Sequence, residues 1–393
     1  PGTVRLTATV KDYAAVSATV ELTVTDTVIP YALADGSGNI YFDTATGTIV
    51  RSDNTVQNVS IPASINGVAV TSIAPYVFHD GGYGTITAVT IPKSMREIGS
   101  HAFWSCSKMT SLRFAGGSEL ETIGEYAFHT CNTLTSVSIP ASVKTIENFA
   151  FYGCSKMESL RFASGSRLQS IGESAFIGCD ALSGVSLPEG LKTVGRTAFY
   201  NCDKMEYLRV PDSVTSIGEN AFSYCDSLKS VTISGEMDLK KVLLNDTLDT
   251  LTLSGTFVQK AVSARNVKLL DTITEVRDGA FEWQRIEQLL LSQNLKTIGA
   301  EAFEGTEITS VTLPEGIVTL GERAFACCGN LTTVNLPDSL QSVGKDCFTE
   351  CGKLNILDLS SVPDTFVEPE TKLDDRGVVP PVLVRATGGK VSG

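Results

Sequence analysis

The chain has 393 residues, of which 42% are hydrophobic, and it carries a formal net charge of −13 at pH 7. This hydrophobic content allows a sizeable core and excludes disorder over most of the chain, while the negative charge argues against nucleic acid as a partner. No run of about 18 apolar residues occurs, so the sequence predicts no membrane insertion. The chain starts at Pro1 with neither Met nor a signal peptide, and we expect a fragment of a longer protein.

The first residues predict β-structure that is separate from the rest of the chain. VRLTATVKD and ATVELTVTD alternate apolar and polar residues, and the second ends at Asp26. We expect residues 1–27 to be an all-β fragment, the C-terminal hairpin of an immunoglobulin-like domain. Residues 28–58 contain the strand–turn–strand pattern NIYFDTATGTIVRS, which predicts an N-terminal β cap on the array that follows.

One phrase then recurs and decides the fold. It reads TIGEYAFHTC at 122–131, TIENFAFYGC at 145–154 and SIGESAFIGC at 170–179. Apart from one wide gap, the step lies within the range of about 20–29 residues that is typical of leucine-rich repeats. The phenylalanine of the phrase is found at positions 78, 103, 128, 151, 176, 199, 222, 281, 303, 325 and 348.

Each unit contains a short strand. Leu134, Val137 and Ile139 follow the pattern apolar-x-x-apolar-x-apolar. The alternation of apolar and polar residues at the end of this pattern predicts a short half-buried strand, which Pro140 terminates. The Ala150-Phe151 step predicts one helical turn on the opposite side. The sequence therefore predicts an α/β repeat: a leucine-rich-repeat solenoid over residues 59–360, with short helical turns opposite about 14 short concave strands. The strand centres are 59, 89, 112, 137, 160, 185, 208, 231, 251, 267, 289, 311, 334 and 357.

The phrase is absent between Phe222 and Phe281, yet strand patterns persist around Leu251 and Val267. We predict two degenerate turns in an irregular stretch at 234–275, with the step from 251 to 267 shorter than a normal repeat. Residues 361–393 are predicted to form a C-terminal cap or tail that ends in one strand.

The units IPASVKTIENFAFYGCSKMESL and LPDSLQSVGKDCFTECGKL resemble the BspA-like leucine-rich repeats of bacterial surface proteins. The resemblance covers about residues 59–360 and departs from the pattern at 234–275. Bacterial immunoglobulin-like domains often flank such arrays. The resemblance implies a secreted or cell-surface protein used in adhesion or host contact, and it identifies the fold far more specifically than the ligand.

Catalytic chemistry has little support in the sequence. The three histidines, His79, His101 and His129, have no His-x-x-x-His or Cys-x-x-Cys partner, and we expect them to be surface or half-buried filler. Carboxylates are scattered along the turns, so no acid–base pair is predicted. We expect no enzyme, no cofactor and no metal site.

Ten cysteines are present, and eight of them share one position of the repeat. They would suit disulfides in an exported protein, or a buried column in which Cys acts as a small hydrophobe. Thr306 replaces Cys in one turn, and equivalent positions project in parallel, whereas a disulfide needs converging Cβ vectors. We therefore expect a structural column of reduced thiols, with Cys327 and Cys347 outside it: Cys106, Cys131, Cys154, Cys179, Cys202, Cys225, Cys328 and Cys351.

The outward residues of the strands are mostly small and polar. Three arginines depart from this pattern, because Arg113, Arg161 and Arg209 recur once every two turns, about 10 Å apart. With Tyr207 and Lys268 they predict a ligand-binding stripe that suits anions. The alternative is a duplicated unit whose arginines are solvated or paired with Glu158 or Glu206.

These patterns are compatible with three hypotheses about function. The first is a monomeric, non-enzymatic binding module for adhesion, which binds a host or matrix protein or an acidic glycan through the solenoid face. The second is a structural surface spacer that carries other domains and has no ligand of its own. An unrecognised enzyme is the least favoured.

Overall fold

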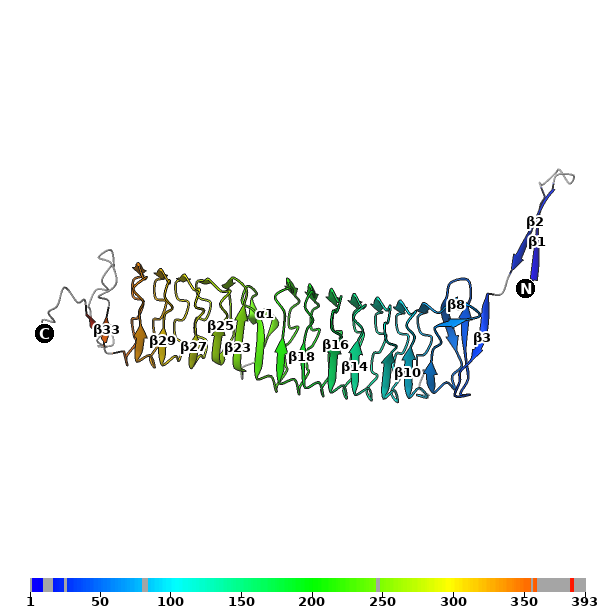
Figure 1. Ribbon diagram of the computed structural model, residues 1–393, viewed down its shortest axis with the longest axis horizontal. Helices are drawn as coiled ribbons and strands as arrows, with labels where there is room; N and C mark the ends of the chain where they lie inside the picture. Colours follow the sequence, from blue (N-terminus) through cyan, green and yellow to red (C-terminus); the bar gives the residue numbers. More distant parts are fainter. Residues whose placement is uncertain are drawn as a thin grey trace.

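The structure, a computed structural model, describes residues 2–9, 17–24, 27–79, 84–244, 248–354, 356–358 and 382–384, with side chains between 27 and 354. From residue 27 the chain forms a rod of stacked turns in which neighbouring colours, and so neighbouring repeats, lie side by side (Figure 1). The solenoid predicted from the repeat is confirmed. No helix in the described ranges is long and apolar enough to cross a membrane.

One column of strands runs along the rod. Their pairing is parallel and sets the predicted centres opposite one another, as in Val59 opposite Val89 and Val89 opposite Leu112. The short step is also as predicted, because Leu251 pairs with Val231 on one side and with Val267 on the other. The column comprises β6 (Asn58–Ser60), β10 (Ala88–Ile91), β12 (Ser111–Phe114), β14 (Ser136–Ile139), β16 (Ser159–Phe162), β18 (Gly184–Ser186), β20 (Tyr207–Arg209), β22 (Ser230–Ser234), β23 (Leu248–Ser254), β25 (Ala264–Leu269), β27 (Gln288–Leu290), β29 (Ser310–Thr312) and β31 (Thr333–Asn335). The next strand along the chain, β33 (Ile356–Asp358), belongs to a separate sheet.

A second column of two-residue strands lies on another side of each turn, and the sequence did not predict it as strand. Two residues are too few to show alternation, although the apolar member, such as Ile146, was visible in the repeat. These strands form two parallel sheets. They are β9 (Ser72–Ile73), β11 (Glu97–Ile98), β13 (Thr122–Ile123), β15 (Thr145–Ile146), β17 (Ser170–Ile171), β19 (Thr193–Val194) and β21 (Ser216–Ile217), then β24 (Phe257–Val258), β26 (Glu275–Val276), β28 (Thr297–Ile298), β30 (Thr319–Leu320) and β32 (Ser342–Val343).

The helical turn expected at the Ala-Phe step is not present. In the described residues the only α-helix is α1 (Leu239–Val242). Around Phe128 the chain makes tight turns in which Tyr126 and Thr130 adopt positive φ, 55° each. The amide of Phe128 donates to the carbonyl of Ala150 in the next turn, 2.7 Å away. Because the backbone groups bond between turns and the αL residues interrupt the right-handed path, a helix cannot propagate here.

The N-terminal end of the solenoid is covered by an antiparallel meander. It consists of β3 (Val28–Ala32), β4 (Asn39–Asp43) and β5 (Thr48–Ser52), and β5 pairs in parallel with β9. Its residues Ile40, Phe42 and Ile49 are fully buried. The small hairpin of β7 (Ser64–Ile65) and β8 (Val68–Ala69) follows. The meander therefore closes the exposed edge and apolar core of the first turn.

Both ends of the chain carry further strand pairs. β1 (Gly2–Thr9) and β2 (Ser17–Val24) pair antiparallel from Gly2 opposite Val24, and their assignment to an immunoglobulin-like domain stays a prediction. At the other end β33 pairs in parallel with β34 (Val382–Val384). Apart from these three residues, the predicted tail at 361–393 lies outside the described part of the chain.

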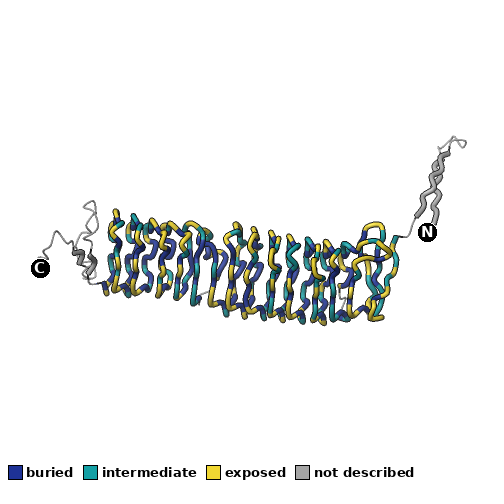
Figure 2. Tube along the Cα trace, viewed as in Figure 1, coloured by how far each residue is buried: buried dark blue, intermediate teal, exposed yellow. Residues whose placement is uncertain are grey.

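The core is a set of stacked columns, and buried positions recur in every turn (Figure 2). The phenylalanines of the repeat form the largest column, with Phe103, Phe128 and Phe151 fully buried and stacked at centroid distances of 5.2 and 5.1 Å. Each ring is covered by the turns on both sides, so a single turn has no core of its own. This interior fixes the outward direction of the strand residues described next.

Candidate functional site

The predicted cationic stripe lies on the outward face of the first strand column. Parallel register places Arg113 opposite Thr90, Arg161 opposite Ser138 and Arg209 opposite Ser186, so the three arginines share one position of the turn. All three side chains are exposed. Neighbouring strands in a sheet are about 4.8 Å apart, so arginines separated by two turns lie about 10 Å apart.

The ion pairs of the stripe differ from those considered in the sequence. The guanidinium of Arg209 lies 2.9 Å from the carboxylate of Glu189, and both side chains are more than half exposed. Glu206 instead pairs with Lys229 at 3.1 Å. Arg113 and Arg161 form no ion pair with any residue between 27 and 354 that the structure describes. Pairing with Glu158 or Glu206 therefore does not account for the arginine row.

Two further predicted residues lie on the same face. Lys268 is exposed and stands opposite Thr252 on one side and Leu290 on the other, in the same position of the turn as the arginines. Tyr207 precedes Arg209 by two residues on β20, and 49% of its surface is exposed. Side chains two residues apart on a strand point to the same side. The structure thus brings Tyr207 and Arg209 together, and it leaves Lys268 further along the rod.

The repeated cysteines lie in the interior, and no disulfide joins them in the structure. Each donates a hydrogen bond from Sγ to the carbonyl of a phenylalanine in the preceding turn, as Cys131 does to Phe103 at 3.3 Å and Cys202 to Phe176 at 3.4 Å. Burial raises the pKa of Cys154 to about 12. A thiol held protonated in this way is a poor nucleophile and a poor metal ligand.

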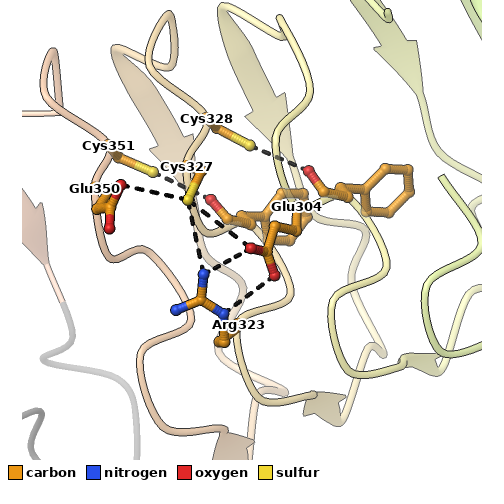
Figure 3. A network of polar contacts seen from close by, with 8 residues as sticks. Glu304, Arg323, Cys327, Cys328, Glu350 and Cys351 are labelled. Carbon is orange, nitrogen blue, oxygen red and sulfur yellow. Dashed lines mark hydrogen bonds and ion pairs between the residues drawn. The ribbon is translucent and has the colours of Figure 1, made fainter. Parts of the chain in front are cut away.

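Cys327 lies outside the column in a polar cluster near the C-terminal end (Figure 3). Arg323 and Glu304 form a two-point ion pair there, with N–O distances of 2.6 and 3.1 Å, and only 8% of the Glu304 side chain is exposed. The Cys327 thiol lies 3.6 Å from a carboxylate oxygen of Glu350. Burial and the two carboxylates raise the pKa of Cys327. The cluster therefore keeps the thiol neutral.

A ladder of aromatic rings on the Ala-Phe turns was missed by the sequence reasoning. Tyr76, His101, Tyr126 and Phe149 come from successive turns, and their rings stack at 4.4, 4.6 and 4.7 Å. Burial lowers the pKa of His101. The signal was present in the repeat, since the residue two before each core phenylalanine reads Tyr, His, Tyr, Phe over four turns. It was missed because the histidines were considered only as possible metal ligands.

No catalytic arrangement emerges from these clusters. Between residues 27 and 354, the described His, Cys, Asp and Glu side chains do not form a group of three or more that could hold a metal ion. Two repeating arrays of side chains reach the surface, the strand face with its exposed arginines and the aromatic ladder, in which Tyr76 is exposed and the other three rings are half-buried. Stacked two-strand turns, a phenylalanine core and a regular outward face together define a leucine-rich-repeat solenoid.

Comparison with known proteins identifies the particular family. The model of the BspA type leucine rich repeat region matches residues 71–167, 163–258 and 274–366, which is well over half of the chain. The chain therefore belongs to the BspA-type leucine-rich-repeat family. No curated protein matches the chain.

Several solved structures are similar to the chain. A leucine rich cell surface protein from Faecalibacterium prausnitzii is 23% identical, with a TM-score of 0.47 over 90% of this chain and 98% of that one. The pneumococcal vaccine antigen PcpA is 18% identical, with a TM-score of 0.43 over 92% and 100%. A leucine-rich repeat protein from Bacteroides ovatus is 21% identical, with a TM-score of 0.37 over 88% and 100%.

Proposed function

We propose that this chain is a non-enzymatic binding module of a secreted or surface-attached bacterial protein, and that it binds an anionic host or matrix polymer through the outward face of its first strand column. The observation that carries the proposal is the column position shared by Arg113, Arg161 and Arg209. Membership of the BspA-type family supports the surface location, since the family resemblance implies it.

Charge favours an anionic ligand over a neutral one. The chain carries a net charge of −13, so a column of exposed arginines is a local positive feature on an acidic protein. A guanidinium stays charged at physiological pH and can bind a carboxylate or sulfate with two hydrogen bonds. A polymer that repeats its charge can contact several arginines at once, and weak contacts then add through effective concentration. An acidic glycan meets these requirements.

The test replaces all three arginines with Ser, the residue found at this position in the intervening turns at Ser138 and Ser186. Exposed ion pairs contribute about 0.5 kcal/mol each, so three lost contacts should weaken binding about tenfold. Binding to hyaluronan, polygalacturonate and heparin is measured by calorimetry at two salt concentrations. Affinity of the parent should fall as salt rises, because exposed charges are screened beyond about 8 Å at physiological ionic strength.

A matched control removes the same charge elsewhere. Arg96, Arg196 and Arg285 are exposed, lie outside the strand face and form ion pairs with Glu119, Glu173 and Glu307. Their triple replacement with Ser changes the net charge equally and should leave affinity close to that of the parent. Equal losses in both triple variants would show that only total charge matters. If the parent binds none of the polymers, the array is better explained as a spacer that carries other domains.

A further inference from the structure

The ring of Tyr207 lies flat on the strand face, over Gly184. The two residues are opposite each other in the parallel pair of β18 and β20. A Cβ atom placed on Gly184 would lie within 2.6 Å of the ring atoms Cδ1, Cε1 and Cζ. Gly184 is buried, whereas 49% of Tyr207 is exposed. One face of the ring therefore covers the glycine backbone and the other faces solvent.

The glycine and the tyrosine are two adjacent departures from an otherwise small, polar column. At the residue before each strand centre, from β6 to β31, Tyr207 is the one aromatic residue and Gly184 the one glycine. A strand column that contacts only water would require neither a glycine nor an aromatic residue at these positions. The column reads Asn58, Ala88, Ser111, Ser136, Ser159, Gly184, Tyr207, Ser230, Thr250, Asn266, Gln288, Ser310 and Thr333.

Two arginines flank the exposed face of this ring. Arg209 is two residues beyond Tyr207 on the same strand, and so about 7 Å away on the same side. On the other side β16 carries Arg161 and lies next to β18 (Figure 1), and the Ser183 amide donates to the Glu158 carbonyl at 3.2 Å between these turns. Since the ring extends over β18, it lies between the strand of Arg161 and that of Arg209.

Both cations are available to a ligand. Arg161 has no ion pair within the described part of the chain, and its side chain is exposed. Arg209 binds Glu189 at 2.9 Å, but this pair is open to water, and exposed pairs of this kind are weak enough to exchange for a ligand carboxylate.

We infer that Tyr207, supported by Gly184 and flanked by Arg161 and Arg209, forms a subsite for one uronic acid residue of an acidic polysaccharide; this rests on the proposed function. The aromatic face is negative in its quadrupole and attracts the weakly positive C–H face of a pyranose ring. A carboxylate on that sugar is within reach of a guanidinium at either side, which can hold it by two hydrogen bonds. An acidic peptide would use the arginines without the ring.

The experiment compares uronate polymers with an anion that has no sugar ring. Calorimetry is carried out with hyaluronan and polygalacturonate, and with poly-L-glutamate as the ringless probe. Tyr207→Ser should weaken uronate binding about three- to tenfold, the range expected for the loss of one aromatic contact, and leave poly-L-glutamate binding unchanged. Tyr207→Phe keeps the ring and should keep the affinity. Gly184→Ala should act like Tyr207→Ser, because the new Cβ lifts the ring off the strand.

Tyr224→Ser is the matched control, since Tyr224 is also half exposed but lies on the Ala-Phe turn, away from the strand face. It should bind as the parent does, and circular dichroism confirms that each variant is folded. If uronates and poly-L-glutamate bind equally and Tyr207→Ser has no effect, the subsite is overturned while the proposed function stands. If none of these polymers binds, the proposed function fails, and the subsite with it.

Discussion

The thiol of Cys154 donates a 3.3 Å hydrogen bond to the carbonyl oxygen of Phe128, one turn earlier in the solenoid. The same oxygen accepts the amide of Cys131 at 3.2 Å. The core phenylalanine of one turn is thus tied to the cysteine of its own turn and to that of the next. This hydrogen bond connects the cysteine and phenylalanine columns. The S–H group of Cys donates to the carbonyl oxygen, whereas an aliphatic side chain at the same position would leave that oxygen with one hydrogen bond fewer.

The thiols of the cysteine column should react slowly with alkylating reagents in the folded protein. Burial raises the pKa of Cys131, Cys154 and Cys179, that of Cys154 to about 12, so few of these thiols are ionised at pH 8. We expect slow alkylation of the native protein, and ten free thiols once it is unfolded without reductant. Mass spectrometry after alkylation measures both states. A disulfide between two column cysteines would contradict the parallel arrangement of the column.

Removing a ring from the middle of the phenylalanine stack should be costly. Phe128→Ala is expected to lower the free energy of unfolding by about 3–5 kcal/mol, because the residue is fully buried and stacked on both sides. Among the described residues Phe348 stacks on one ring, that of Phe325 at 5.6 Å, and it retains 5% exposure. Phe348→Ala should therefore cost less. Urea unfolding followed by circular dichroism gives the comparison, and equal losses at both positions would argue against coupling through stacked turns.

Gly195, which follows the short strand β19, should tolerate no side chain. A Cβ on Gly195 would lie within 2.6 Å of backbone atoms of Gly172 and Glu173 in the preceding turn. Gly195→Ala is expected to cost about 1–3 kcal/mol or more, since backbone cannot move aside locally. Gly116 has no atom within 4 Å of the same position, and Gly116→Ala should change stability by less than about 0.5 kcal/mol. Thermal and urea unfolding of both variants provide the test.

Two histidines should make stability depend on pH: His101 in the aromatic ladder, and His129, whose ring stacks on Tyr152 at 4.7 Å. Burial lowers the folded-state pKa of His101 and of His129 below the ordinary value of about 6.5. Between the folded and unfolded values the unfolded chain binds more protons, so the free energy of unfolding should fall as pH is lowered through that window. His101→Phe, which removes the titrating group but keeps an aromatic ring between Tyr76 and Tyr126, should reduce this dependence. NMR titration of the two imidazoles measures the pKa values, and values at or above 6.5 would contradict the prediction.

Much of the strand face was predictable because, in a solenoid, the repeat period of the sequence sets where each residue lies within its turn. Residues at equivalent places in successive repeats must stack, so the register of Arg113, Arg161 and Arg209 followed from the spacing alone. The degenerate turns at Leu251 and Val267 followed for the same reason, since apolar positions persisted when the phrase did not. The aromatic residues of the ladder were visible in the repeat, two positions before each core phenylalanine, but whether the rings from Tyr76 to Phe149 stack depends on the conformation of the turns, which the repeat does not specify.

By itself, the sequence determined the repeat period, the family, the identity of the buried columns and the outward position of Tyr207. Each of these depends on the period and on side-chain polarity, which are local properties. Only the tertiary structure decided that the Ala-Phe segment is a tight turn and not a helix, because its amides bond to carbonyls one turn away, as Phe128 does to Ala150. It also decided that the Tyr207 ring lies over Gly184, since that contact joins residues 23 positions apart whose approach depends on the absence of a Cβ atom between stacked strands.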